Sequence, residues 1–187
     1  MVAAETEPDD GMREALTRSQ RGDHAAFGDI VRRHQSMVFS IALHFTRDEA
    51  EAEELAQDVF VQLYRNIGRI ESPDHLAFWL RRVAGHRCID HLRKRPGRTE
   101  QPLEAIAEPA GPSASGDLLL EGLLRRLVAT LPEIARLVVI LRFQEDLEPG
   151  EIAEALDMPL NTVKSHLHRS LALLRDKLGV LARRGGL

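Results

Sequence analysis

The chain has 187 residues, of which 43% are hydrophobic and 29% charged, and its formal net charge is −4. This balance excludes a chain that is disordered throughout, and the net charge argues against a protein that coats nucleic acid indiscriminately. The single cysteine, Cys88, excludes an intrachain disulfide and a thiolate metal cage, and no apolar run approaches the roughly 20 residues of a membrane span, so we expect a cytoplasmic protein with no membrane insertion of its own.

The first half of the chain has the pattern of amphipathic helices. An acidic tail over residues 1–11 precedes an expected helix at Met12–Arg21, which Gly22 ends. Asp23 then stands where the N-cap of a second helix belongs. Apolar residues at helical spacing predict the buried stripe of that helix: Phe27, Ile30, Val31, Val38, Ile41, Ala42 and Phe45.

A third expected helix begins after Asp48, which resembles a capping box with Glu51. One of its faces is apolar, with Leu55, Val59, Leu63 and Ile67, and the opposite face carries Glu54, Asp58, Gln62 and Arg65. The segment from Asp48 to Asp58 holds six acids and no base, whereas Arg81 to Arg98 holds seven bases against one acid. This segregation favours two partners, a basic protein surface and a polyanion.

Ser72 and Pro73 provide an N-cap and a first helical residue for a long fourth helix, which Pro96-Gly97 ends. Its inward face is expected at Leu76, Leu80, Val83 and Ala84. Residues 96–117 are rich in Pro, Gly and Ser and predict a linker. Further helices are expected at Leu118–Thr130, from Pro132 through Arg142, around Glu151–Leu156 and at Leu160–Leu178. No run has strand period, so the predicted fold is all-α, with two small helical domains joined by a flexible linker.

The last two expected helices have the pattern of a helix-turn-helix. Ile152, Ala153 and Leu156 face inward on the first helix, and Asp157-Met158-Pro159 turns the chain, with Asp157 expected to be left-handed. Val163, Leu167 and Leu171 are expected to anchor the second helix. Its outward residues are donors able to reach base edges or phosphates in a major groove: Asn161, Thr162, Lys164, Ser165, His168 and Arg169. An ordinary helical hairpin with a solvated polar face is the alternative interpretation.

Longer motifs make a family resemblance specific. Leu131-Pro132-Glu133, Gly150-Glu151-Ile152-Ala153-Glu154 and the run from Met158 to Arg169 resemble region 4 of the extracytoplasmic-function (ECF) sigma factors. The first half of the chain resembles region 2 of the same family in five places: Gly22-Asp23, Ala25-Ala26-Phe27, the run from Glu54 to Phe60, Phe78-Trp79-Leu80 and the run from Cys88 to Arg93. The two motif sets stand in the family's order and cover residues 12 to about 180. Asn161 replaces a common Gly and His166 a common Arg, so the promoter preference of relatives does not carry over.

The resemblance implies a transcription initiation factor, with a region 2 domain at 12–95, a linker at 96–117 and a region 4 domain at 118–183. Its partners would be core RNA polymerase, promoter DNA and an anti-sigma protein. Residues implied in polymerase binding are Glu54, Gln57, Asp58 and Gln62. Residues implied in melting the downstream promoter element, with a flipped base held in the loop Ile70–Phe78, are Ser72, Asp74, His75, Phe78, Arg81, Arg82, Arg87, Arg93, Lys94 and Arg95. Residues implied in reading the upstream element are Asn161, Thr162, Lys164, Ser165, His166, His168 and Arg169.

Other functions fit the residues less well. The histidine pairs His86/His91 and His166/His168 lack the i, i+4 spacing of helical metal ligands, so we expect no metal, no cofactor and no enzyme. A helical hydrolase using histidines and carboxylates is an alternative from another class. A stand-alone helix-turn-helix regulator would leave residues 12–95 unexplained. Trp79 either stacks near DNA or belongs to the core, and its position between Leu76 and Val83 favours the core.

Overall fold

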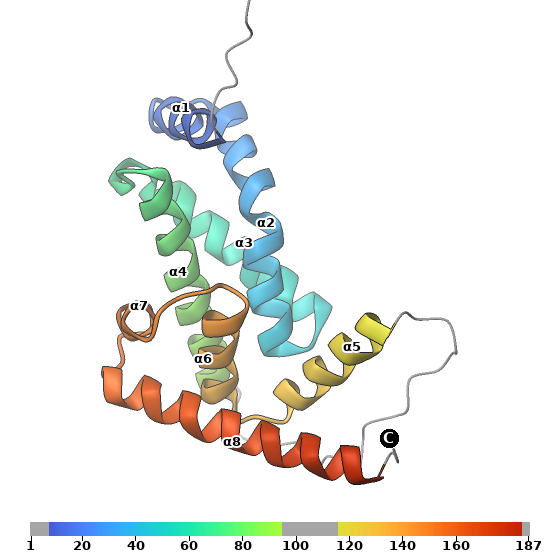
Figure 1. The fold of residues 1–187 in the computed structure, drawn as a ribbon. Coiled ribbons are helices and arrows are strands. Elements are labelled where there is room, and N and C mark those ends of the chain that lie inside the picture. Colours follow the sequence, from blue (N-terminus) through green and yellow to red (C-terminus); the bar gives the residue numbers. More distant parts are fainter. Residues whose placement is uncertain (1–7, 95–115, 185–187) are drawn as a thin grey trace, which may run out of the picture. The chain divides into compact units, whose positions relative to one another are not determined.

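The computed structural model describes residues 8–94 and 116–184, and every element within these ranges is helical (Figure 1). The chain divides into two compact units, Met1–Cys88 and Ile89–Leu187. The expected linker at 96–117 lies outside the described residues except for its last two positions, which belong to a helix. None of the described helices is long and apolar enough to cross a membrane.

The first unit contains α1 (Pro8–Gln20), α2 (His24–Thr46), α3 (Glu49–Asn66), a 3-10 turn η1 (Ile67–Arg69) and most of α4 (Pro73–Lys94). α1 begins at Pro8, four residues before the start expected at Met12. α1 packs on α2, which in turn packs along α3 (Figure 1). The described core of this unit consists of the buried faces of α1, α2, α3 and α4.

Local side-chain bonds determine where these helices begin. Asp23 accepts from the amides of Ala25 (2.9 Å) and Ala26 (3.1 Å), which confirms it as the N-cap of α2. Gly22 has φ 92°, a left-handed conformation that favours glycine and allows the turn between α1 and α2. Asp48 likewise caps α3 by accepting from the Glu51 amide at 3.0 Å.

The predicted core stripes are largely confirmed. Ile30, Val38, Ile41, Ala42 and Phe45 of α2, Leu55, Val59 and Leu63 of α3, and Leu76, Leu80 and Ala84 of α4 are buried. Four residues predicted as core are only half-buried: Phe27, Val31, Ile67 and Val83. Phe27 and Val31 line an open groove, described below, which explains their partial exposure.

The second unit is organised around α6 (Glu133–Phe143), whose residues from Ala135 to Leu141 are all buried. α5 (Gly116–Ala129), α7 (Pro149–Ala155) and α8 (Leu160–Arg184) each pack against α6, and α8 also contacts α5 and α7. Arg136 is buried within α6, and its Nη2 donates to the carbonyls of Ala129 (2.9 Å) and Leu131 (3.1 Å). This guanidinium satisfies carbonyls that the end of α5 leaves unpaired.

Candidate nucleic-acid and protein interfaces

The acidic face of α3 is accessible. Glu54, Gln57 and Asp58 are exposed and Gln62 is half-buried, while Leu55, Val59 and Leu63 on the other side of the helix are buried. The spacing of Glu54, Asp58 and Gln62 by four residues aligns them along the helix. The structure therefore brings all four residues predicted for this surface onto one polar face.

An apolar groove borders this acidic face between α2 and α3. It has a volume of about 970 Å³, and Gln57 lies on its wall, which makes the two features continuous. Val61 is 47% exposed and Tyr64 51% exposed, and both lie on this one groove, so their exposed apolar area is contiguous. The aromatic part of the groove consists of Phe27, Phe39, Phe60 and Tyr64.

The sequence interpretation missed Val61 and Tyr64 as site residues. The Tyr64 ring meets the Phe27 ring edge-on, with centroids 5.2 Å apart, and stacks on His24 at 6.1 Å. Both residues lie outside the Leu55–Val59–Leu63 stripe. An apolar residue away from the buried face of the helix was therefore the sequence signal that could have indicated them. Glu49 and Glu53 also line the groove, which gives it an acidic margin.

The loop expected at Ile70–Phe78 is a loop only as far as Ser72, because Pro73 already begins α4 and Phe78 lies in its second turn. A compact set of hydrogen bonds holds this junction. Ser72 Oγ accepts from the His75 amide at 3.1 Å, which makes Ser72 the helix cap that the sequence predicts. His75 Nδ1 in turn accepts from the Glu71 amide at 3.2 Å. Because Nδ1 is the acceptor, the proton of the neutral ring is on Nε2. Ser72, His75 and Phe78 are half-buried, and Asp74 is exposed.

Basic residues continue from this loop along α4. Arg82, Arg93 and Lys94 are exposed and Arg81 and Arg87 are half-buried, whereas Arg95 lies outside the described residues. Arg93 pairs with Asp90 at 3.4 Å on the surface, an interaction weak enough to exchange for a phosphate. Trp79 is half-buried, so part of its ring contacts protein and part reaches the surface.

One uncharged group lies close to this basic helix. His34 of α2 is half-buried, and its Nε2 is buried without a hydrogen-bond partner. Burial lowers the pKa of His34 below 6.5, and the neighbouring charges of Arg33 and Arg81 lower it further. The imidazole of His34 is therefore neutral at pH 7, so it adds no positive charge beside Arg81.

The helix-turn-helix is formed by α7 and α8. Asp157 has φ 52°, which confirms the expected left-handed residue in the turn, and the Met158 amide donates to the Ala153 carbonyl at 2.9 Å to close it. Glu151 accepts from the Glu148 amide at 2.7 Å, so the Glu148-Pro149 start of α7 is itself capped. Ile152 and Leu156 are buried as predicted, but the fully buried small residue is Ala155, and Ala153 is half-buried.

The buried side of α8 differs from the prediction at one position. Val163 is buried and Leu167 half-buried, but Leu171 is 42% exposed and Ser170 is buried instead. Each helical residue advances about 100°, so Leu171 lies about 80° from Val163 and Ser170 only about 20°. Leu171 was therefore wrongly predicted as an anchor.

The outward face of α8 carries the predicted donors. Asn161, Lys164, His168 and Arg169 are exposed, and Thr162, Ser165 and His166 are half-buried. Arg169 Nε donates to the Ser165 carbonyl at 3.3 Å, which leaves the outer nitrogens of its guanidinium for another acceptor. Burial and the nearby Arg169 charge lower the pKa of His166. This face can therefore present two cations, Lys164 and Arg169, with the uncharged ring of His166 between them in sequence.

Two family models match the chain. The model described as Sigma-70 region 2 matches residues 30–97, and the model described as Sigma-70, region 4 matches residues 121–174. The chain is 27% identical to the ECF RNA polymerase sigma factor SigW of Bacillus subtilis over 89% of its length and 96% of that protein. It is 28% identical to the ECF RNA polymerase sigma-E factor of Escherichia coli over 90% of its length and 95% of that protein.

Solved structures share the fold. CnrH, solved with the cytosolic domain of CnrY, is similar with a TM-score of 0.64 at 22% identity, covering 91% of this chain and 99% of that one. The sigma factor RpoE from Bartonella quintana, solved with the anti-sigma factor NepR, has a TM-score of 0.62 at 18% identity, covering 82% and 97%. At these identities the likeness concerns the helical fold alone.

Proposed function

We propose that this chain, which belongs to the ECF group of the sigma-70 family of RNA polymerase sigma factors, connects core polymerase to promoter DNA through three separate surfaces. As an alternative sigma factor it directs transcription initiation and is not an enzyme. A stand-alone regulator would not account for the region 2 match over residues 30–97.

The polymerase-binding surface is the acidic face of α3 together with the apolar groove beside it. Glu54 and Asp58 supply charge for a basic partner, and Val61 and Tyr64 supply apolar area that residues 8–94 and 116–184 leave uncovered. Charge at a rim with an apolar centre is the usual composition of a protein–protein interface. The continuity of face and groove through Gln57 is the observation that carries this proposal.

The variant Asp58→Lys tests it. Charge reversal at an interface rim is expected to weaken binding to core polymerase by about tenfold, while the fold is retained because Asp58 is exposed. Asp176→Lys, an equal charge change at an exposed position on α8, serves as the control and is expected to bind as the wild type does. Unchanged affinity of the Asp58 variant would count against this surface.

The two DNA surfaces have different tasks. The segment Ile70–Phe78, a short loop that continues into the first turns of α4, holds a base flipped from the downstream element. The basic residues of α4 follow the freed strand, because unstacking a base needs both a pocket and an electrostatic track. The outward face of α8 reads the upstream element as duplex DNA. We place these tasks in a region 2 domain at 12–95 and a region 4 domain at 118–183, joined by a linker.

We also propose an anti-sigma partner and a cytoplasmic location. RpoE of Bartonella quintana, which shares the fold, was solved with its anti-sigma factor NepR. A sigma factor must reach polymerase and DNA, which places the working form in the cytoplasm. Copurification of this chain from its own host, with mass spectrometry of the bound proteins, tests both partners at once.

A further inference from the structure

Gln20, the last residue of α1, reaches the connection between α3 and α4. Its side-chain amide nitrogen donates to the carbonyl of Ile67 at 3.1 Å and to the carbonyl of Ile70 at 2.7 Å. The Ile70 amide also donates to the Ile67 carbonyl at 3.2 Å, which closes the turn η1. One side chain, 47 and 50 residues away in sequence, therefore fixes the spacing of two carbonyls at the two ends of this turn.

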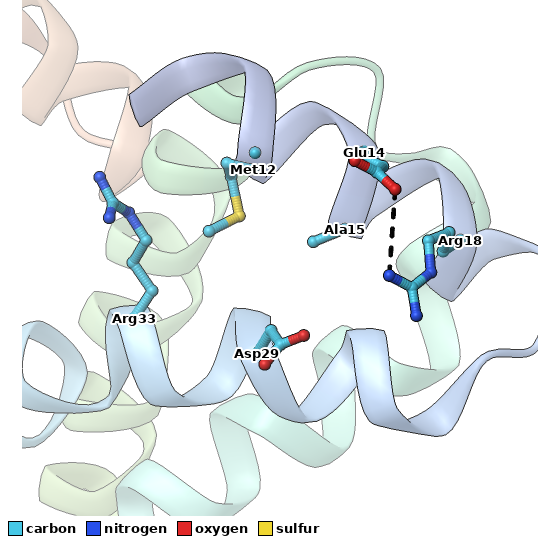
Figure 2. A pocket seen from close by; sticks show the side chains of 7 residues that line it. Met12, Glu14, Ala15, Arg18, Asp29 and Arg33 are labelled. Atoms are coloured by element: carbon cyan, nitrogen blue, oxygen red, sulfur yellow. Dashed lines mark ion pairs between the residues drawn. The ribbon is translucent and has the colours of Figure 1, made fainter. Parts of the chain in front are cut away.

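The helix that carries Gln20 is itself firmly seated. Met12, Ala15 and Leu16 of α1 are buried. Arg18 donates to the Asp23 carboxylate at 3.0 and 2.7 Å, across the turn into α2. Figure 2 shows side chains of α1 and α2 facing one another across a small pocket of about 260 Å³, with the Glu14–Arg18 ion pair at its edge. α1 can therefore act as a fixed support for what Gln20 holds.

The held connection leads directly into the proposed base-binding loop. Ile70 is 2% exposed, so its position is fixed by its buried side chain as well as by its bonded carbonyl. The next residue, Glu71, donates to His75, and Ser72 caps α4 by accepting from the His75 amide. A displacement at Ile70 would consequently be passed to Ser72 and His75, both of them in the set implied in downstream-element binding.

We propose that Gln20 is a positioning residue for downstream-element recognition: it contacts no DNA, and it holds the connection from Ile67 to Ile70 so that the following loop is preformed for the flipped base. This inference rests on the proposed function of that loop. A preformed pocket binds more tightly because ordering costs are met before the ligand arrives. Without Gln20, the loop would retain its local bonds and lose its attachment to α1.

Three variants separate this role from general stability. Gln20→Met keeps the length of the side chain and removes the donor, whereas Gln20→Lys keeps a donor of similar reach. Thr17→Val is the matched control, because it removes the hydroxyl bond from Thr17 to the Arg13 carbonyl (2.9 Å) one turn earlier on α1. The probe is fluorescein-labelled single-stranded DNA, selected from a randomised pool for binding to wild-type holoenzyme, together with a version carrying one changed base.

For Gln20→Met holoenzyme we expect about tenfold weaker binding of the selected strand, because two hydrogen bonds of ordinary strength are lost. Discrimination against the changed base should fall to a similar degree. Affinity for core polymerase should stay within about twofold of wild type, since the acidic face of α3 is not altered. Hydrogen exchange at the Glu71 and His75 amides should be faster in the free Gln20→Met chain. Gln20→Lys should recover most of the binding, and Thr17→Val should behave as the wild type.

Three results would overturn the inference. If Gln20→Met keeps both the affinity and the base discrimination of the wild type, Gln20 does not position the loop. If it loses binding to core polymerase in the same proportion, its effect is structural and not specific to DNA. If wild-type holoenzyme discriminates among no single-stranded sequences, the proposed function of the loop fails, and the role of Gln20 fails with it, an outcome distinguished by the wild-type measurement alone.

Discussion

Lys164 and Arg169 on the outward face of α8 should respond differently to removal. Both are exposed, but Lys164 lies in the second turn of the helix, where a recognition helix approaches base edges, and Arg169 lies one to two turns further on. The Arg169 guanidinium is already bonded to the Ser165 carbonyl through Nε, so only its outer nitrogens are available. We therefore expect Lys164 to contact a base and Arg169 to contact chiefly a phosphate.

The magnitudes follow from these two roles. Loss of a base contact costs about 1–3 kcal/mol, so Lys164→Ala should weaken binding of the best upstream sequence by about 5- to 150-fold and relax preference at one position. Loss of a phosphate contact weakens all sequences alike and lowers the salt slope by about one. For Arg169→Ala the deficit relative to wild type should therefore shrink about 3.5-fold between 50 and 200 mM salt.

The assay is holoenzyme binding to single-base variants of the upstream element at several salt concentrations. Asp176→Lys, two turns beyond Arg169 on the same helix, can serve as a control for nonspecific electrostatic effects, and it should alter the salt slope without changing base preference. If neither Lys164→Ala nor Arg169→Ala changes affinity, preference or salt dependence, α8 is not the DNA reader.

Four further predictions concern stability, titration, reactivity and free DNA binding. Arg136→Met should destabilise the second unit by about 2–4 kcal/mol in urea unfolding, because one buried and one partly buried carbonyl lose a charged donor; equal stability would mean that relief of the buried charge offsets the loss. Because the folded-state pKa of His34 is lowered, the unfolded chain binds its proton first, so stability should fall as the pH drops below about 6.5, and it should fall less in His34→Gln. Cys88 is fully buried and its pKa is raised to about 12, so iodoacetamide at pH 8 should label it only after unfolding; labelling of the native chain would contradict this burial. The free chain, with a net charge of −4, should bind duplex promoter weakly at physiological salt and gain affinity in holoenzyme, where two weak contacts become one bivalent attachment; tight specific binding alone would favour a stand-alone regulator.

The features that the sequence predicted correctly depend on local chemistry. Asp23 and Asp48 cap their helices through bonds to amides two or three residues away, so their roles follow from spacing. The left-handed Asp157 was predictable for the same reason, since the turn between α7 and α8 spans few residues. Family motifs added the identity of the domains, which no local pattern contains.

The features that were missed depend on packing between elements. Leu171 continued an apolar spacing of four, but the buried stripe of a long helix advances by 3.6 residues, so Ser170 takes the inward position. Phe27 and Val31 had the spacing of core residues and instead line the groove, because α3 leaves that side of α2 partly uncovered. The bonds from Gln20 to Ile67 and Ile70 join residues about 50 apart, and no periodicity could have indicated them.

Run-off transcription with purified core polymerase tests the central claim most directly. Core enzyme is incubated with a promoter library, with and without this chain, and transcripts are sequenced. We expect the chain to produce transcripts from a small set of promoters that share an upstream and a downstream element, and to produce about tenfold fewer when Asp58→Lys replaces the wild type at limiting concentration. Absence of any transcript that depends on the chain, with core enzyme shown to be active using another sigma factor, would contradict the account.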